Sequence, residues 1–183
     1  MNARSRVAQG FSPASDAALK GCATGKPSVV IGLISDTHGL FRPEVAQALA
    51  GVTLILHAGD VGGTQVLAAL AKIAPVDAVF GNVDDSRDPM LRRERSTTVN
   101  GVTIYVSHGH ELGSPTPERV LARYAADVVV FGHTHKAVVF RDPSGRLAVN
   151  PGAAGPRRFD LQPSVARLTV VDGRADVEII SLA

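Results

Sequence analysis

The sequence predicts an α/β fold with both parallel and antiparallel strands. From Val29 onward, short runs rich in Val and Ile alternate with Ala- and Leu-rich stretches of helical spacing, a pattern typical of parallel strands joined by helices. The second half of the chain adds three hairpin signals, which indicate antiparallel pairing. We therefore expect mixed sheets with helices outside them and favour two sheets packed face to face, although periodicity does not fix their number.

Five apolar runs are the predicted strands, and each is nearly all apolar, as strands covered on both faces are. They span residues 29–35, 53–58, 77–80, 102–107 and 128–131. The helices between them are expected at Pro43 with residues 44–50, at residues 65–74 with Thr64 as the cap, and from Thr116 and Pro117 to residue 125. The hairpin turns are expected at Asn100-Gly101, at residues 143–145 and at Asp172-Gly173.

Length and composition predict one domain over residues 28–183, preceded by a loosely ordered extension at residues 1–27. A chain of 183 residues with 45% hydrophobic and 20% charged residues suits one globular domain. No apolar run approaches the length of a membrane-spanning helix, and one cysteine excludes an intrachain disulfide. We expect a cytoplasmic protein that does not bind membranes, with a homo-oligomer left open.

The charge balance does not favour nucleic-acid binding. The formal net charge is +2, and aromatic residues make up 4% of the chain with no tryptophan. A nucleic-acid-binding surface usually needs a clustered positive field or stacking aromatic side chains. The local cluster of Arg92, Arg93 and Arg95 is interpreted as a solvated helix face or loop.

Each of the five predicted strands ends on a potential metal ligand. In open α/β sheets, ligands bind beyond the carboxyl ends of the strands, so these side chains are expected to converge. A Gly or Ser precedes each ending and leaves room for an ion beside the backbone. The candidate ligands are Asp36, His38, Asp60, Asn82, His108, His133 and His135.

The spacing and the donor types both favour a metal site. In Asp36-Thr37-His38 and in His133-Thr134-His135, the period of two points both side chains the same way if the backbone stays extended. Carboxylates, imidazoles and one amide oxygen suit Mn²⁺, Fe or Zn²⁺, and the absence of thiolates argues against a structural zinc site. A single strand-end Asp often caps a helix and a single buried His is often only hydrogen-bonded, but seven such residues are hard to explain separately.

These motifs resemble those of the calcineurin-like metallophosphoesterases, and most closely the small phosphodiesterases of the YfcE type. The matching motifs are D-x-H, G-D, G-N-x-D, H-G-H and G-H-T-H, in that order, from about Val29 to the hairpins after Asn150-Pro151-Gly152. The resemblance implies a four-layer α/β/β/α sandwich with two mixed sheets. It also implies a hydrolase that cleaves small phosphodiesters through attack by a metal-bridging hydroxide.

The resemblance further implies two divalent metal ions, with Mn²⁺ expected first and Fe, Zn²⁺, Ni²⁺ or Mg²⁺ as alternatives. Asp60 would bridge the two ions. Two cations about 3.5–4 Å apart lower the pKa of a shared water and neutralise phosphate oxygens. One ion would be held by Asp36, His38, Asp60 and His135, and the other by Asp60, Asn82, His108 and His133.

The third motif departs from the family pattern, because Val83 stands where many members have a histidine that is thought to help protonate the leaving group. The chain therefore lacks the usual general acid, and we expect activated phosphodiesters to be the better substrates. His110 could supply the proton or only hydrogen-bond a neighbour. Asp84 has the family position for orienting neighbours, and both are predicted as catalytic residues. Asn82 and His110 are the predicted substrate-binding residues.

Three other residues near these motifs are weaker candidates. Lys136 and Arg157 could contact phosphate oxygens, although a solvated surface position fits them as well. His57 precedes Asp60 by three residues and is expected in the core or beside the ligands.

The alternative to an enzyme is a non-catalytic, metal-binding interaction scaffold, since a retromer subunit of the same fold acts in this way. The retromer subunit lacks part of the metal-binding motifs, whereas Asp36, His38 and Asp60 are all present here. This difference favours catalysis. A nucleotide-binding α/β domain without metals is disfavoured because no G-x-G-x-x-G loop follows the first strand.

Overall fold

The computed structural model describes residues 27–158 and 160–182. The extension predicted at residues 1–27 lies, apart from Pro27, outside the described residues. The division of the chain into this extension and one domain therefore stays a prediction.

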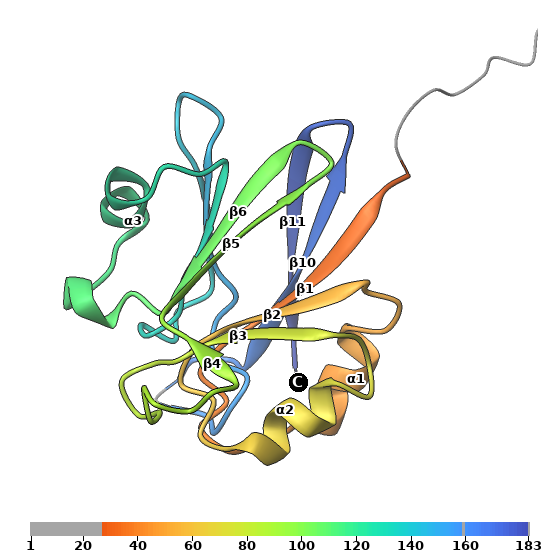
Figure 1. The fold of residues 1–183 in the computed structure, drawn as a ribbon, viewed down its shortest axis with the longest axis vertical. Helices are drawn as coiled ribbons and strands as arrows, with labels where there is room; N and C mark the ends of the chain where they lie inside the picture. Colours follow the sequence, from red (N-terminus) through yellow and green to blue (C-terminus); the bar gives the residue numbers. More distant parts are fainter. Residues whose placement is uncertain (1–26, 159, 183) are drawn as a thin grey trace, which may run out of the picture.

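Two mixed sheets form the centre of the fold (Figure 1). The six-stranded sheet has the order β11-β10-β1-β2-β3-β4. β1 to β4 are parallel, while β10 is antiparallel to both β1 and β11. The strands are β1 (Val29–Ile34), β2 (Leu54–Ala58), β3 (Val76–Val79), β4 (Leu91–Arg92), β10 (Ser164–Val171) and β11 (Arg174–Ser181).

The five-stranded sheet has the order β5-β6-β7-β9-β8. Its inner pairs β6-β7 and β7-β9 are parallel, and its outer pairs β5-β6 and β8-β9 are antiparallel. The strands are β5 (Glu94–Val99), β6 (Val102–Ser107), β7 (Val128–Val130), β8 (Val138–Arg141) and β9 (Leu147–Asn150). Each sheet thus has parallel strands at its centre, whose carboxyl ends provide the loops of the candidate site.

The helices cover the outer faces of the two sheets. α1 (Pro43–Ala48) and α2 (Thr64–Leu70) lie together against the six-stranded sheet, and α3 (Pro117–Arg123) lies on the other side of the molecule against the five-stranded sheet (Figure 1). A single 3-10 turn, η1 (His110–Leu112), follows β6. No helix in the described ranges has the length and apolar character that a membrane crossing requires.

Three apolar clusters separate the layers, and they follow from the alternation of side chains along each strand. In β1, Ile31 and Leu33 point between the sheets, while Ile34 points toward α1 and α2. The cluster between the sheets also receives Ile104 and Val130 from the five-stranded sheet. A third cluster packs α3 against that sheet. The expected four-layer α/β/β/α sandwich with two mixed sheets is therefore confirmed.

The predicted strands and hairpin turns agree with the structure to within one residue at each strand end. The prediction for Thr64 was wrong, because Gly63 occupies the cap position and Thr64 is already the first residue of α2. Thr116 does cap α3, accepting a hydrogen bond from the Arg119 backbone N–H.

The interpretation of the arginine cluster as a solvated helix face or loop holds for the exposed Arg93, which lies in a bend, but not for the two arginines that lie in strands. Arg92 lies in β4 and Arg95 in β5. β4 has two residues and β5 is mostly polar, so neither strand forms an apolar run that the sequence could show. Arg95 donates to both carboxylate oxygens of Asp77 at 2.8 and 2.7 Å and so links β5 of one sheet to β3 of the other.

Candidate metal centre

The seven candidate ligands lie together at the carboxyl ends of the central strands. Asp36, Asp60 and Asn82 follow β1, β2 and β3 of the six-stranded sheet, and His108 and the pair His133 and His135 follow β6 and β7 of the other. A chain of side-chain contacts, each no longer than 3.7 Å, runs through all seven residues. Strand ends from both sheets therefore meet in one cluster, as the sequence predicted.

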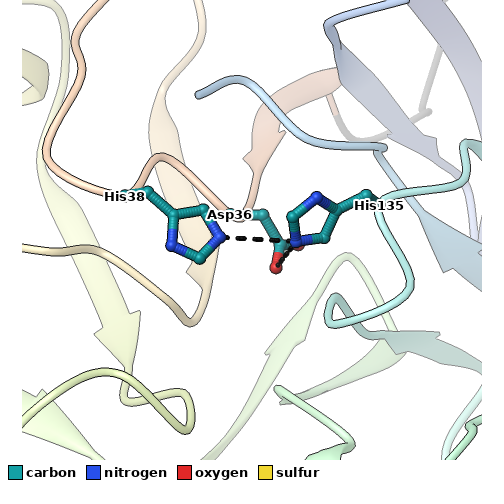
Figure 2. Close-up of side chains that lie close together, drawn as sticks. All are labelled: Asp36, His38 and His135. Atoms are coloured by element: carbon teal, nitrogen blue, oxygen red, sulfur yellow. Dashed lines mark hydrogen bonds and ion pairs between the residues drawn. The ribbon is translucent and has the colours of Figure 1, made fainter. Parts of the chain in front are cut away.

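Asp36, His38 and His135 form one end of this cluster (Figure 2). The Nε2 atoms of His38 and His135 face each other at 3.3 Å, and His135 Nε2 lies 3.2 Å from Asp36 Oδ1. Asp36 is fully buried, and its Oδ2 accepts hydrogen bonds from Ser35 Oγ and the His133 backbone N–H. Its Oδ1 is buried without a hydrogen bond of regular geometry from any described residue.

Asn82, His108 and His133 form the other end. His108 is buried and its Nδ1 lies 2.7 Å from the Ala58 carbonyl. The Asn82 Oδ1 atom lies 3.2 Å from His108 Nε2 and 2.9 Å from His133 Nδ1. One amide oxygen is thus placed between two imidazole rings.

Asp60 lies between the two ends. Its Oδ2 is 3.7 Å from His38 Nε2, and its Oδ1 is 3.4 Å from His108 Nε2. The same Oδ1 accepts a hydrogen bond from the Val83 backbone N–H at 3.1 Å. Two groups of acidic and histidine side chains have ligand atoms close enough to hold one ion, and both groups include Asp36. The residue that faces both ends of the cluster is nevertheless Asp60, through its two oxygens.

The polar atoms around His108 are better arranged to bind a cation than to form hydrogen bonds with one another. Because the Ala58 carbonyl can only accept, His108 donates from Nδ1, and in the neutral ring Nε2 is then an acceptor. That acceptor faces Asp60 Oδ1 and Asn82 Oδ1, which makes three lone pairs pointing at one space. Such a group needs either an extra proton or a metal ion between its atoms, and a backbone carbonyl that orients the ring is usual for metal-bound histidines.

Burial and neighbouring charges shift the pKa values of the cluster in opposite directions. Burial raises the pKa of Asp60, but the contact with His108, the Val83 N–H and the charge of His38 together lower it to about 2. Burial lowers the pKa of His108, yet the contact with Asp60 and the charge of Asp36 raise it overall. Burial dominates at His38 and His133 and lowers the pKa of each. Carboxylates and mostly neutral imidazoles are the protonation states in which these groups bind metals.

The backbone at the ligands is not extended, so the assumption behind the two-residue spacing was wrong. Five of the seven candidate ligands have φ between 45° and 68°, in the left-handed region; they are Asp36, His38, Asp60, His133 and His135. Such conformations cost on the order of 1–3 kcal/mol each and persist where the surroundings impose them, often at functional sites. Each pair still converges, because the chain turns sharply after its strand.

The glycines before the ligands make room for other ligands, not for an ion. A Cβ atom at Gly81 would overlap Asp60 Oδ1 and the Asp60 backbone N, and one at Gly59 would lie 2.6 Å from His108 Nδ1. At Gly132 a Cβ would lie 2.8 Å from Asp36 Oδ2. The strand ends therefore pack against each other's side chains at distances that glycine alone allows.

Asp84 holds the loops after β2 and β3 together. Its Oδ2 accepts from the backbone N–H groups of Val61 and Gly81 at 3.0 and 2.9 Å, and its Oδ1 accepts from Gly62 at 2.8 Å. Three backbone donors occupy this carboxylate. These contacts place Asp84 as an orienting residue beside the cluster.

His57 is fully buried beneath the cluster, as the sequence predicted. Its Nε2 lies 2.9 Å from Thr37 Oγ1, which in turn donates to the Val61 carbonyl. Burial lowers the pKa of His57 to about 4, so the ring is neutral. His57 thereby supports the turn that carries Asp36 and His38.

His110 lies at the start of η1, beside the second end of the cluster. Its ring centroid is 5.3 Å from that of His108 and 6.4 Å from that of His133. Its Nδ1 is buried without a hydrogen-bond partner among the described residues and lies 3.7 Å from Glu111 Oε2. Val83, which holds the position of the missing family histidine, is 52% exposed.

Three cationic side chains lie near the cluster. Lys136 is exposed and lines a cavity that also includes His133. Arg157 and Arg158 line a small hollow beside His135. Arg158 was missed from the sequence, but its charge contributes to lowering the pKa of His38. No motif marks it, because it follows the last apolar strand of its sheet in an irregular loop.

Comparisons with known proteins agree with this geometry. The family model described as the calcineurin-like phosphoesterase superfamily domain matches residues 29–173. A probable metallophosphoesterase of Methanothermobacter thermautotrophicus is 36% identical over 161 residues, covering 83% of this chain and 92% of that protein. A phosphodiesterase of Methanocaldococcus jannaschii is 27% identical over 140 residues, covering 67% of this chain and 82% of that protein.

Solved structures share the fold. Vacuolar protein sorting 29 of Cryptosporidium parvum superposes with a TM-score of 0.69 at 24% identity, covering 85% of this chain and 98% of that chain. The phosphoesterase Yfce of E. coli superposes with a TM-score of 0.62 at 23% identity, covering 85% of this chain and all of that chain. At these identities the likeness concerns the fold.

Proposed function

Because the chain belongs to the calcineurin-like phosphoesterase superfamily, we propose that it is a metal-dependent phosphodiesterase with two divalent cations in the cluster of seven ligands. The observation that carries this proposal is that carboxylate and amide oxygens and imidazole nitrogens, which are the atoms that ligate metals, converge in one cluster. His108 Nε2, Asp60 Oδ1 and Asn82 Oδ1 face one another, as do Asp36 Oδ1 and the Nε2 atoms of two histidines.

The distances support a division of the ligands between two cations. Asp36, His38 and His135 would hold one, and Asn82, His108 and His133 the other. Asp60 would bridge, since each of its oxygens faces one of these groups at 3.4–3.7 Å. Bound cations, Mn²⁺ being our first expectation, would supply the Lewis acidity that activates a water and neutralises phosphate oxygens.

The protein residues keep this arrangement in place. The Ala58 carbonyl fixes the His108 ring so that Nε2 faces the cluster. The Val83 N–H donates a hydrogen bond to Asp60. Asp84 accepts hydrogen bonds from the next residue after Asp60 and from Gly81 in the neighbouring loop. A site whose ligands are positioned before substrate arrives loses little energy to reorganisation during the reaction.

We further propose that His110 protonates the leaving group and that Asn82 and His110 contact the substrate. Burial of His110 Nδ1 against Glu111 leaves Nε2 as the ring atom that can reach a substrate. His110 lies beside His108 and His133, on the side of the cluster where Val83 leaves the family histidine missing. General acid help of this kind is worth about 10²–10⁴-fold in rate.

The test measures bound metal and the hydrolysis of bis(4-nitrophenyl) phosphate before chelation, after chelation and after Mn²⁺ is restored. Replacement of Asp60 by Ala should remove bound metal and lower kcat/KM by at least about 10³-fold, because both cations lose their shared ligand and several kcal/mol of charge stabilisation disappear. Glu178→Ala, which removes an exposed carboxylate in β11, is the matched control and should leave both unchanged. Full activity with intact metal content in the Asp60 variant would refute the assignment.

The same experiment distinguishes the scaffold alternative. Vacuolar protein sorting 29 has the same fold, so the fold by itself does not establish catalysis. Wild-type protein that binds Mn²⁺ but hydrolyses neither bis-aryl nor mono-aryl phosphates would favour an interaction scaffold.

A further inference from the structure

A cavity of about 520 Å³ opens directly beside the candidate metal centre. One wall is the segment 113–117, from the end of η1 to the first residue of α3, and the other is formed by the loop after β7 and the first residue of β8. Its apolar lining comes from Pro115, Pro117, Phe131 and Val138. The volume falls within the range of about 300–1,000 Å³ that small-molecule sites usually have.

The cavity walls are anchored in the fold. Phe131 belongs to the cluster that packs α3 on the five-stranded sheet and is 1% exposed. Pro115 is also buried, and a Cβ atom at Gly109 would lie 3.3 Å from its ring. The apolar surface is therefore a preformed part of the molecule.

His133 joins the cavity to the metal centre. Its Nδ1 lies 2.9 Å from Asn82 Oδ1 inside the cluster, and the same residue lines the cavity. An organic group esterified to a phosphate at the cluster would therefore lie next to the cavity, with His133 between the two. Because His133 belongs to both places, we assign the cavity to a group that is part of the phosphate ester and not to a separate small molecule.

We propose that this cavity binds an apolar ring carried by the phosphate ester, with Val138 as a residue that determines specificity. This inference rests on the proposed function and adds the class of substrate, namely esters with an aryl or similarly sized apolar group. Exposed Lys136 also lines the cavity and suits a ring, since an ammonium group is attracted to an aromatic face.

The test compares phenylphosphonate with methylphosphonate, which share the anionic group and cannot be hydrolysed at the P–C bond. Calorimetric titration into Mn²⁺-loaded protein should show at least about 10-fold tighter binding of phenylphosphonate, because a single methylene in an apolar pocket is already worth about 10-fold or more. Val138→Asn should reduce this ratio by at least about 5-fold, because it places an unpaired amide against the ring.

The matched control is Val139→Asn. Val139 is the next residue of β8, is 41% exposed and does not line the cavity. Val138→Thr keeps the side-chain volume and the β-branched shape, so it guards against a folding defect in the Asn variant and should lower the ratio in the same direction. The control variant should keep the wild-type ratio.

The outcomes separate this inference from the proposed function. Equal binding of the two phosphonates by a wild-type protein that hydrolyses bis(4-nitrophenyl) phosphate would overturn the cavity and leave the proposed function standing. An unchanged ratio in both Val138 variants would overturn it as well. If neither phosphonate binds the Mn²⁺-loaded protein, the proposed function is overturned together with the cavity.

Discussion

In the candidate metal centre, the close approach of the side chains depends on positive φ angles at the candidate ligands and on glycines, which have no Cβ atom, beside them. The sequence indicated the ligands because each follows an apolar strand, but it gave no sign that Asp36 and His38 have left-handed backbone conformations. The sequence indicated that a small residue must precede each ligand, but it attributed this need to space for an ion and not to contact with other side chains. The space beside Gly81 and Gly59 is filled by Asp60 and His108.

Replacement of Gly81 by Ala tests this close packing. The added Cβ would overlap Asp60, so this carboxylate must move away from His38 and His108. We expect Mn²⁺ affinity to fall by about 10–100-fold, the usual cost of disturbing groups that orient metal ligands. Calorimetric titration with Mn²⁺ measures the change.

Gly101→Ala is the control for this variant. Gly101 lies in the β5-β6 turn with φ of 88° and no atom within 4 Å of an added Cβ. It should lose about 1–2 kcal/mol of stability from the left-handed backbone and keep its Mn²⁺ affinity. Equal Mn²⁺ affinities for the Gly81 variant and the wild type would show that Asp60 does not need this space.

At the scale of secondary structure elements, apolar runs predicted the central strands, whereas the edge strands β5, β8 and β11 were indicated only by their hairpin turns and β4 was not predicted. β1, β2, β3, β6 and β7 are apolar because both faces are covered, so their sequence signal is strong. β4 has two residues and β5 is mostly polar, and such edge strands lack that signal. Thr64 was taken for a cap because of its residue type, whereas the sharp turn before α2 requires the φ of 145° that Gly63 adopts.

Hydrogen bonds at the end of α3 link several elements in a way that no motif indicated. The Tyr124 hydroxyl, directly after α3, lies 2.5 Å from Glu111 Oε1 in η1 and 3.2 Å from Ser107 Oγ in β6. Burial and the bond to Glu111 raise the pKa of Tyr124 to about 12. This network supports η1, the turn that carries His110.

Tyr124→Phe should lower stability at pH 8 by about 1.5–3 kcal/mol, the range for a hydrogen bond to a charged group. In the wild type, the unfolded chain releases the phenolic proton near pH 10 and the folded protein only near pH 12. The stabilisation is therefore complete below pH 10 and disappears as the pH rises toward 12. Urea unfolding between pH 8 and 11.5 measures both effects.

The variant should lose less stability than the wild type over the alkaline part of this range. Part of the wild-type loss remains in the variant, because burial and Glu94 also raise the pKa of Tyr105. The same dependence of stability on pH in both proteins would contradict the role given to Tyr124.

At the scale of the whole molecule, the candidate metal centre lies where the ends of both sheets meet. Asp36, Asp60 and Asn82 come from one sheet, and His108 and His133 come from the other. The sequence predicted that the ligands converge and favoured two sheets packed face to face, but periodicity did not fix the number of sheets, and only the family resemblance implied the four-layer sandwich. Side-chain alternation fixes which face of a strand is buried and not which sheet covers it.

Cations bound between the two sheets should stabilise the entire fold, because the unfolded chain cannot hold the ligands together. Mn²⁺ at 100 times its dissociation constant should raise the free energy of unfolding by about 2.7 kcal/mol. Thermal and urea unfolding over a series of Mn²⁺ concentrations measure this increase. An increase of the same size in Asp60→Ala would show that the ion binds elsewhere.

The most direct test of the central claim is anomalous X-ray diffraction from crystals grown with excess Mn²⁺. We predict two anomalous peaks about 3.5–4 Å apart, one on each side of the Asp60 carboxylate, with His38 and His135 beside one and His108 and His133 beside the other. Absence of both peaks from this cluster, or manganese found only at other positions, would contradict the account.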